Sequence, residues 1–244
     1  MNHQNPTVVL VHGAFAESAS WNDVIHNLYG EGLDVLAVAN PLRSVTGDAA
    51  YVRDVIAGLG KPVLLVGHSY GGMVITEAAA ENPAVLGLAY VAAFAPDHGE
   101  SALQLSTMFP GSTLGEALTA YPVSTGGNEF TIRLEVFREQ FAADVPAPVA
   151  GLMSRTQRPI TEHALSEPLP TDAPAWRSKP SWFILGDQDR NIPAELVRYE
   201  AERSGARGLR EVEGGSHALS VSHPDEVTRT ILEALEGVHT ATAA

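Results

Sequence analysis

Six short runs of apolar residues recur along the chain, and stretches with helical periodicity separate most of them. The runs are apolar almost throughout, which is typical of strands buried on both faces. Strands of this kind joined through helices form a parallel sheet with helices on both sides. The runs cover residues 7–11, 33–38, 62–66, 85–91, 181–185 and 208–212, and the helical stretches cover residues 21–29, 48–59, 70–81, 194–202 and 225–235.

One long segment, residues 97–179, interrupts this rhythm. It holds no clear strand–helix–strand unit, and more than half of the prolines fall between Pro96 and Pro180. A turn is indicated at 126–128, and short helices at 133–141 and 149–155. A long segment without regular strand–helix units inside a compact domain usually has a function. Ligands bind at the edge of the sheet from which this segment would emerge. We therefore predict a core of residues 1–96 and 180–244 with an inserted cap of residues 97–179. The alternative is a packing subdomain with no role in binding.

Composition excludes several functions. The 244 residues carry 15 Lys and Arg against 29 Asp and Glu, a formal net charge of −14, which disfavours binding to nucleic acids and anionic membranes. Zero Cys excludes disulfides, Cys-ligated zinc and a thiolate nucleophile. The first residues show no signal peptide, and no apolar run is long enough to span a membrane. We expect a cytoplasmic monomer or homodimer that uses no metal and no cofactor.

The sharpest motif is Gly67-His68-Ser69-Tyr70-Gly71-Gly72, which follows the strand at 62–66 and precedes a helical stretch. This G-x-S-x-G pattern between strand and helix is typical of a nucleophile on a strained turn, where side chains larger than glycine would collide with nearby backbone. Ser69 is therefore the predicted nucleophile. A glycine-rich connection with a capping serine is the structural alternative.

A serine nucleophile needs a base. His217 follows the last strand on a glycine-rich loop, and His223 precedes Pro224 at the start of a helix. A loop position leaves an imidazole free to point over the edge of the sheet, whereas a helix start favours capping. His217 is the preferred base, with His223 as the alternative.

The base in turn needs a carboxylate that fixes its tautomer. Asp187 and Asp189 follow the strand at 181–185, and Asp97 follows the strand at 85–91. Asp189 is preferred because it lies three residues beyond Gly186 and can reach across the strand ends. Asp187 leaves the strand directly, a position suited to bonding loop amides.

An oxyanion hole completes such a site. After the first strand comes His12-Gly13-Ala14-Phe15, a small-residue turn that can direct the Ala14 N–H toward Ser69. The Tyr70 N–H, next to the nucleophile, is the second predicted donor. His12 and His68 flank these positions, and we expect them to shape the loops rather than transfer protons.

The order Ser69, Asp189, His217, with HGAF early and GHSYGG in the centre, resembles the α/β-hydrolase family over nearly the whole chain outside the insertion. The short N-terminus resembles the compact branch, which includes plant methyl-ester esterases, hydroxynitrile lyases, and bacterial esterases such as pyrethroid hydrolases. The resemblance implies a central, mostly parallel six-stranded sheet with a cap. It also implies that Ser69 attacks, His217 acts as base and then acid, and Asp189 orients His217.

Residues that differ from those of particular branches of the family disfavour the reactions of those branches. Haloalkane dehalogenases and epoxide hydrolases carry Asp at the nucleophile position, and dienelactone hydrolases carry Cys. Hydroxynitrile lyases of this type carry Lys just after the catalytic histidine, where this chain has Ala218. The only lysines, Lys61 and Lys179, lie far from that motif in the sequence.

We therefore expect a serine hydrolase that cleaves small to medium, largely apolar carboxylic esters through an acyl-enzyme. The alternatives are a non-hydrolytic ligand-binding protein and a cofactor-free lyase or oxygenase on the same scaffold. Six side chains are predicted to line the substrate pocket: Phe15, His68, Phe109, Phe137, Met153 and Trp176.

Overall fold

The structure, a computed structural model, describes residues 6–242 and contains a six-stranded sheet. Every neighbouring pair in it is parallel, and the strand order is β2-β1-β3-β4-β8-β9. The predicted parallel sheet is confirmed. Its strands are β1 (Thr7–Val11), β2 (Val35–Val38), β3 (Val63–His68), β4 (Val85–Val91), β8 (Ser181–Gly186) and β9 (Gly208–Val212).

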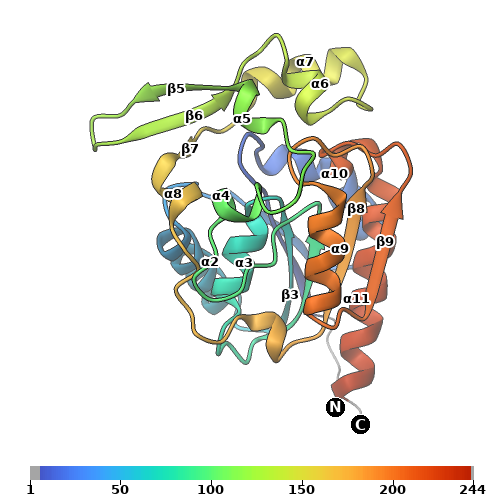
Figure 1. Ribbon diagram of the computed structural model, residues 1–244. Helices are drawn as coiled ribbons and strands as arrows, with labels where there is room; N and C mark the ends of the chain where they lie inside the picture. Colours follow the sequence, from blue (N-terminus) through green and yellow to red (C-terminus); the bar gives the residue numbers. More distant parts are fainter. Residues whose placement is uncertain (1–5, 243–244) are drawn as a thin grey trace.

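Helices cover both faces of this sheet, as Figure 1 shows. One face packs against α2 (Val45–Leu59), α3 (Gly71–Ala78) and α9 (Ala194–Arg203). The other packs against α1 (Asn22–Gly30), α10 (Leu219–Ser222) and α11 (Pro224–Thr242), with the short 3-10 helix η1 (Ser18–Trp21) beside α1.

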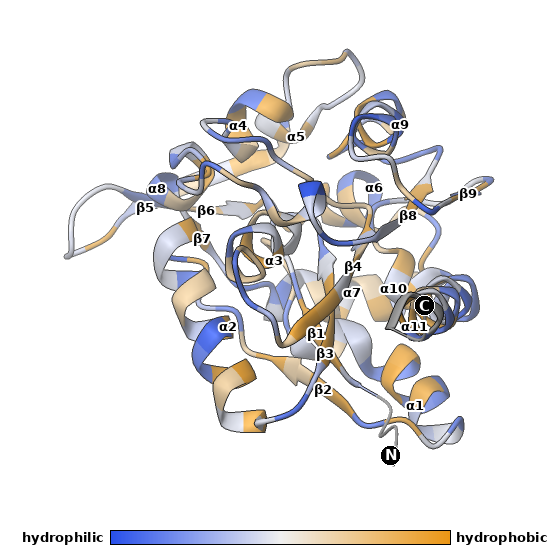
Figure 2. Cartoon of the chain, turned by 90° about the horizontal axis from the view of Figure 1, so that it is seen from below, coloured by the Kyte–Doolittle hydropathy of each residue, from blue (hydrophilic) through white to orange (hydrophobic). Residues whose placement is uncertain are grey.

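Successive strand residues point to opposite faces, which explains why these strands are apolar throughout. In β1, Val9 and Val11 enter the core under α2 and α3, whereas Val8 and Leu10 enter the core under α1 and α11. All four side chains are fully buried. Figure 2 shows the resulting hydrophobic residues along the central strands.

The starts of two elements differ from the prediction by two or three residues, and local interactions explain these differences. Helix α2 begins at Val45 instead of residue 48, because the Ser44 hydroxyl caps it by accepting the Gly47 N–H at 3.0 Å. Strand β2 begins at Val35 instead of residue 33, because the Leu33 N–H is used to close the end of α1 on the Leu28 carbonyl.

The inserted segment forms a second small sheet and several short helices, which lie over one end of the large sheet (Figure 1). The sheet is antiparallel, with the order β5-β6-β7, and its first two strands form a hairpin around the turn indicated at residues 126–128. The elements are α4 (Ala102–Leu105), α5 (Leu114–Ala117), β5 (Leu118–Pro122), β6 (Asn128–Ile132), α6 (Phe137–Phe141), α7 (Ala147–Thr156), β7 (Ile160–Thr161), α8 (Glu162–Ser166) and the 3-10 helix η2 (Ala175–Arg177). We call the segment between β4 and β8 the cap; its boundaries at 96/97 and 179/180 stay a prediction, and residues 1–5 and 243–244 of the predicted core lie outside the described residues.

The strand order places a crevice at the centre of the sheet. From β1 the chain crosses to β2 on one side, and it then returns to β3 on the other side. Loops that leave neighbouring strands in opposite directions open a gap at the carboxyl ends of those strands, where ligands bind in sheets of this kind. The turns after β1 and β3 carry Ala14 and Ser69.

Candidate active site

Ser69 occupies a strained turn between β3 and α3. Its φ angle is 55°, in the left-handed region that residues other than glycine rarely adopt. A Cβ at Gly71 would lie 2.4 Å from the Val11 carbonyl oxygen, and one at Gly67 would lie 2.7 Å from the Gly71 carbonyl oxygen. Only glycines fit at both positions, so the motif is required by close backbone packing. The turn holds the serine at the N-terminus of α3, where the helix dipole favours negative charge.

The two residues predicted as oxyanion donors, Ala14 and Tyr70, line the same cavity as Ser69. Within residues 6–242, neither N–H donates a hydrogen bond to a protein acceptor, although neighbouring N–H groups do: Phe15 donates to the Arg158 carbonyl and Ser69 to the Val91 carbonyl. Unused donors beside a nucleophile can bind a developing oxyanion.

His217 and Asp189 form a buried pair. The imidazole Nδ1 lies 2.6 Å from Asp189 Oδ2, and the two side chains are 1% and 2% exposed. The other carboxyl oxygen, Oδ1, accepts the N–H groups of Asn191 at 2.7 Å and Ile192 at 3.0 Å. Because Nδ1 donates to the carboxylate, a neutral His217 carries its lone pair on Nε2, the tautomer that a general base needs.

Ser69 and His217 line one cavity. Within the described part of the chain, the serine hydroxyl makes no hydrogen bond to the imidazole. Such bonds are often long in the free enzyme and tighten when substrate binds. The structure thus brings the nucleophile candidate, the base–acid pair and both oxyanion donors to one place.

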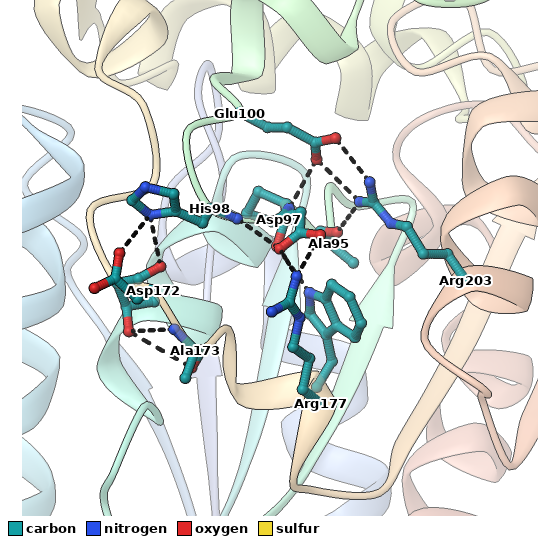
Figure 3. Close-up of polar contacts among 11 residues, drawn as sticks. Ala95, Asp97, His98, Glu100, Asp172, Ala173, Arg177 and Arg203 are labelled. Atoms are coloured by element: carbon teal, nitrogen blue, oxygen red, sulfur yellow. Dashed lines mark hydrogen bonds and ion pairs between the residues drawn. The ribbon is translucent and has the colours of Figure 1, made fainter.

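The alternative acids and base have other partners. Asp97 accepts two hydrogen bonds from Arg177 at 2.6 and 2.7 Å, in the surface network that Figure 3 shows. Asp187 accepts the N–H of Gly214 at 2.7 Å, as expected for a residue that bonds loop amides. His223 lies 3.2 Å from Asp144 in the cap. Of the three carboxylates, only Asp189 contacts His217 among the described residues.

His12 and His68 are fully buried and hold the loops of the site. Burial lowers the pKa of His68 well below its usual value, and burial lowers that of His12 to about 4, so both rings are neutral at pH 7. His68 Nε2 donates to the His217 carbonyl at 2.9 Å, and His12 Nδ1 donates to the Gly13 carbonyl at 2.9 Å. These contacts agree with roles in shaping loops.

The cavity has a volume of about 480 Å³ and a mostly apolar lining. It contains no Lys or Arg side chain among the described residues, and besides His217 and Tyr70 its only titratable group is Glu116. Both lysines lie elsewhere: Lys61 pairs with Asp34, and Lys179 donates to the carbonyls of Asn82 and Val85. The lining therefore suits neutral ligands and offers no cation for an acidic one.

Of the six residues predicted to line a substrate pocket, Phe15 and Phe109 line this cavity, and the other four lie outside its lining. His68 is buried beneath His217, and Phe137 stacks on Phe141 inside the cap. Met153 packs against the core. Trp176 donates its indole N–H to the Pro96 carbonyl at 2.7 Å, away from the cavity.

Several lining residues were missed by the sequence reasoning. Those with large side chains come from the loop after β4, from α4, α5, the start of β5 and α8, and from the loop that carries Asp189: Phe94, Leu103, Leu114, Leu118, Leu165 and Ile192. Their apolar side chains are the only signal in the sequence, and that signal does not distinguish a residue that faces a cavity from one that packs in a core.

A parallel sheet with this strand order, a strained serine after β3 and a histidine–aspartate pair after β8 and β9 define a protein with the architecture of an α/β-hydrolase. The comparison with known sequences points to the same family. Residues 8–230 match the model of the Alpha/beta hydrolase family, so the chain belongs to that family.

The chain is similar to proteins that are named as an esterase, a synthase and a lyase. It is 30% identical to a pimeloyl-[acyl-carrier protein] methyl ester esterase from Xanthomonas oryzae over 74% of each protein. It is 25% identical to norfluorocurarine synthase 2 from Strychnos over 96% of this chain and 97% of that protein. It is 24% identical to an α-hydroxynitrile lyase from Arabidopsis thaliana over 90% and 93%.

Solved structures share the fold. Polyneuridine aldehyde esterase superposes with a TM-score of 0.79 at 20% identity, covering 94% of this chain and 99% of that one. A pyrethroid hydrolase from Sphingobium faniae superposes with a TM-score of 0.73 at 22% identity, covering 95% and 97%. The resemblance to the compact branch of the family, drawn from the motifs, is confirmed.

Among the described residues, no helix is both long enough and apolar enough to cross a bilayer.

Proposed function

We propose that the protein is a serine esterase that cleaves carboxylic esters through an acyl-enzyme intermediate. The observation that carries the proposal is the buried His217–Asp189 pair, whose imidazole lines one cavity with Ser69, Ala14 and Tyr70. The backbone N–H groups of Ala14 and Tyr70 make no hydrogen bond to a protein acceptor among the described residues. The relatives that are named esterases support the same chemistry.

The first half of the reaction forms the acyl-enzyme. His217 Nε2 takes the Ser69 proton while the serine oxygen attacks the ester carbonyl carbon. The carbonyl oxygen becomes an anion that the Ala14 and Tyr70 N–H groups bind, an arrangement worth about 3 kcal/mol per donor in comparable enzymes. Asp189 stabilises the imidazolium, which then gives its proton to the leaving alcohol as the carbon–oxygen bond breaks.

Water completes the cycle. His217 takes a proton from a water molecule while the water oxygen attacks the acyl carbon. The imidazolium then gives this proton to the Ser69 oxygen as its bond to the acyl carbon breaks, which releases the acid and restores Ser69. Apart from the ester and water, every group in this cycle comes from the chain itself, so the proposed mechanism uses no metal or organic cofactor.

The cavity sets the substrate class. With a volume of about 480 Å³ and aromatic and aliphatic walls, it fits small to medium esters that are neutral and largely apolar. The net charge of −14 and the carboxylate of Glu116 at the lining disfavour esters that carry an additional carboxylate.

Turnover of a series of p-nitrophenyl esters by wild type and Ser69→Ala tests the proposal. We expect wild-type hydrolysis and a loss of several orders of magnitude in the variant, whose circular dichroism should be unchanged. Equal turnover by both proteins would exclude Ser69 as nucleophile.

A second candidate, cofactor-free lyase chemistry, has one observation in its favour, the similarity to an α-hydroxynitrile lyase. Ala218 follows His217 where such lyases carry lysine, and neither lysine of this chain lines the cavity. Cyanohydrin cleavage by wild type in the absence of any ester turnover would favour this candidate, whereas stoichiometric ligand binding without either activity would favour a binding protein.

A further inference from the structure

One element of the cap touches both loops that carry the histidine–aspartate pair. Helix α6 and the turn after it, residues 137–144, lie above α10 and the upper end of β8 in Figure 1. Asp189 and His217 belong to separate loops, one after β8 and one after β9, so their 2.6 Å contact depends on how these loops are held relative to each other.

Gln140 fixes the loop of the acid. Its side chain is buried, and its Nε2 donates to the Arg190 carbonyl at 2.8 Å and to Asn191 Oδ1 at 2.8 Å. Its Oε1 accepts the hydroxyl proton of Thr113 at 2.8 Å. Asn191 in turn donates its backbone N–H to Asp189 Oδ1, so Gln140 holds the residue that orients the carboxylate.

Asp144 fixes the loop of the base. Its Oδ2 accepts the Ser216 N–H at 3.1 Å, and its Oδ1 accepts the Ser216 hydroxyl. His223, on the far side of α10, lies 3.2 Å from the same carboxylate. Ser216 immediately precedes His217, and the ring of Phe141 in α6 meets the His217 ring edge-on at 4.9 Å between centroids.

We propose that Gln140 and Asp144 are positioning residues for the pair, so that one cap element sets the distance between Asp189 and His217. The inference rests on the proposed function, because it assigns these residues to the reaction of Ser69. A displacement of about 1 Å in such a pair can cost 100-fold in rate. Second-layer contacts of this kind hold reacting groups in their productive geometry.

The test compares wild type with Gln140→Met, Asp144→Ala and Asp144→Asn. The matched control is Glu139→Gln, which breaks an exposed ion pair between the same helix and Arg190 of the same loop. Each protein is assayed for p-nitrophenyl ester turnover and for inhibition by an uncharged alcohol product. The proton on His217 Nδ1 is observed by NMR, since a short charge-assisted hydrogen bond shifts it far downfield.

We expect Gln140→Met and Asp144→Ala to lower kcat about 10- to 100-fold, with little change in KM or product inhibition, and to weaken or shift the downfield proton signal. Asp144→Asn should fall between wild type and Asp144→Ala, because its amide oxygen still accepts from Ser216. Glu139→Gln should match wild type in every readout.

Folded Gln140→Met and Asp144→Ala variants with wild-type kcat and an unchanged downfield signal would overturn the positioning roles. The signal also separates this inference from the proposed function. If wild type hydrolyses no ester yet its downfield signal disappears in both variants, the positioning stands and the esterase proposal fails.

Discussion

Asp189 uses its two carboxyl oxygens for two different partners. Oδ2 binds His217, and Oδ1 is anchored by two backbone N–H groups of its own loop. The anchored oxygen fixes the carboxylate in place, so the second oxygen can fix the tautomer of the imidazole. An amide at position 189 would keep the shape of the side chain but disturb both functions.

Replacement of this acid gives the first prediction. Asp189→Asn should lower kcat by about 10³- to 10⁴-fold, because the amide favours the wrong tautomer of His217. Asp97→Asn is the matched control, since Asp97 binds Arg177 at the surface, and it should retain wild-type turnover. Steady-state kinetics on one ester checks both variants, and a larger loss in Asp97→Asn would reverse the assignment of the acid.

Gly13 gives a second prediction. A Cβ there would lie 2.5 Å from Ser69 Cβ and 2.7 Å from the His68 carbonyl oxygen, so Gly13→Ala must displace the turn that carries the Ala14 N–H. We expect kcat to fall at least about 100-fold with loss of an oxyanion donor. Gly151→Ala in α7, where an added methyl meets open space, should leave kcat unchanged. Wild-type kcat in folded Gly13→Ala would contradict this account of the turn.

At the scale of elements, the core could be predicted and most of the cap could not. The core strands are buried on both faces, so the sequence shows them as continuous apolar runs between helical stretches. Strand β5 is mostly exposed, and its residues Leu118–Pro122 show no alternation that marks a strand. The glycines at 126 and 127 indicated only the turn beside it.

The pocket illustrates the same limit on inference from sequence. An aromatic residue such as Phe137 or Trp176 is apolar whether it faces a cavity or packs inside the cap, and local spacing is identical in both cases. Motifs with a steric requirement are different. Gly67 and Gly71 are needed because backbone lies within 3 Å of any added Cβ, so the sequence itself records the geometry around Ser69.

The start of α2 provides a prediction at this scale. Ser44→Ala removes the hydroxyl that accepts the Gly47 N–H, and it should lower the free energy of unfolding by about 1 kcal/mol without changing kcat. Ser166→Ala, which removes a hydroxyl that only donates to carbonyls of its own helix, should have a smaller effect. Urea titrations measure the free energy of unfolding of both variants. Equal losses would contradict a stabilising role of the Ser44 hydroxyl at the N-terminus of α2.

For the whole molecule, stability depends on pH through buried titratable groups. Burial raises the pKa of Glu200 in α9 to about 8, from an ordinary value of 4.5. Between these two values the folded protein binds more protons than the unfolded chain, so the free energy of unfolding falls as pH rises. His12 has its effect at acidic pH, because its pKa falls from an ordinary value of 6.5 to about 4 in the folded protein. Between these values the unfolded chain binds more protons, so the free energy of unfolding falls as pH falls.

Glu200→Gln should therefore flatten the alkaline side of the stability curve. We expect the variant to be more stable than wild type at pH 8.5 by a few kcal/mol, with the difference shrinking toward pH 5. Glu202→Gln, an exposed neighbour on the same helix, should follow wild type. Urea titrations from pH 5 to 8.5 measure the curve, and a parallel shift at all pH values would contradict ionisation of Glu200 as the cause.

The most direct measurement of the proposed chemistry is mass spectrometry of the enzyme quenched during turnover of a p-nitrophenyl ester. The intact protein should gain the mass of one acyl group, and peptide mapping should place that group on Ser69 and find none on Ser69→Ala. Ester hydrolysis that proceeds with no acyl group on Ser69 at any quench time, including in Asp189→Asn where each step is slowed, would contradict the acyl-enzyme mechanism.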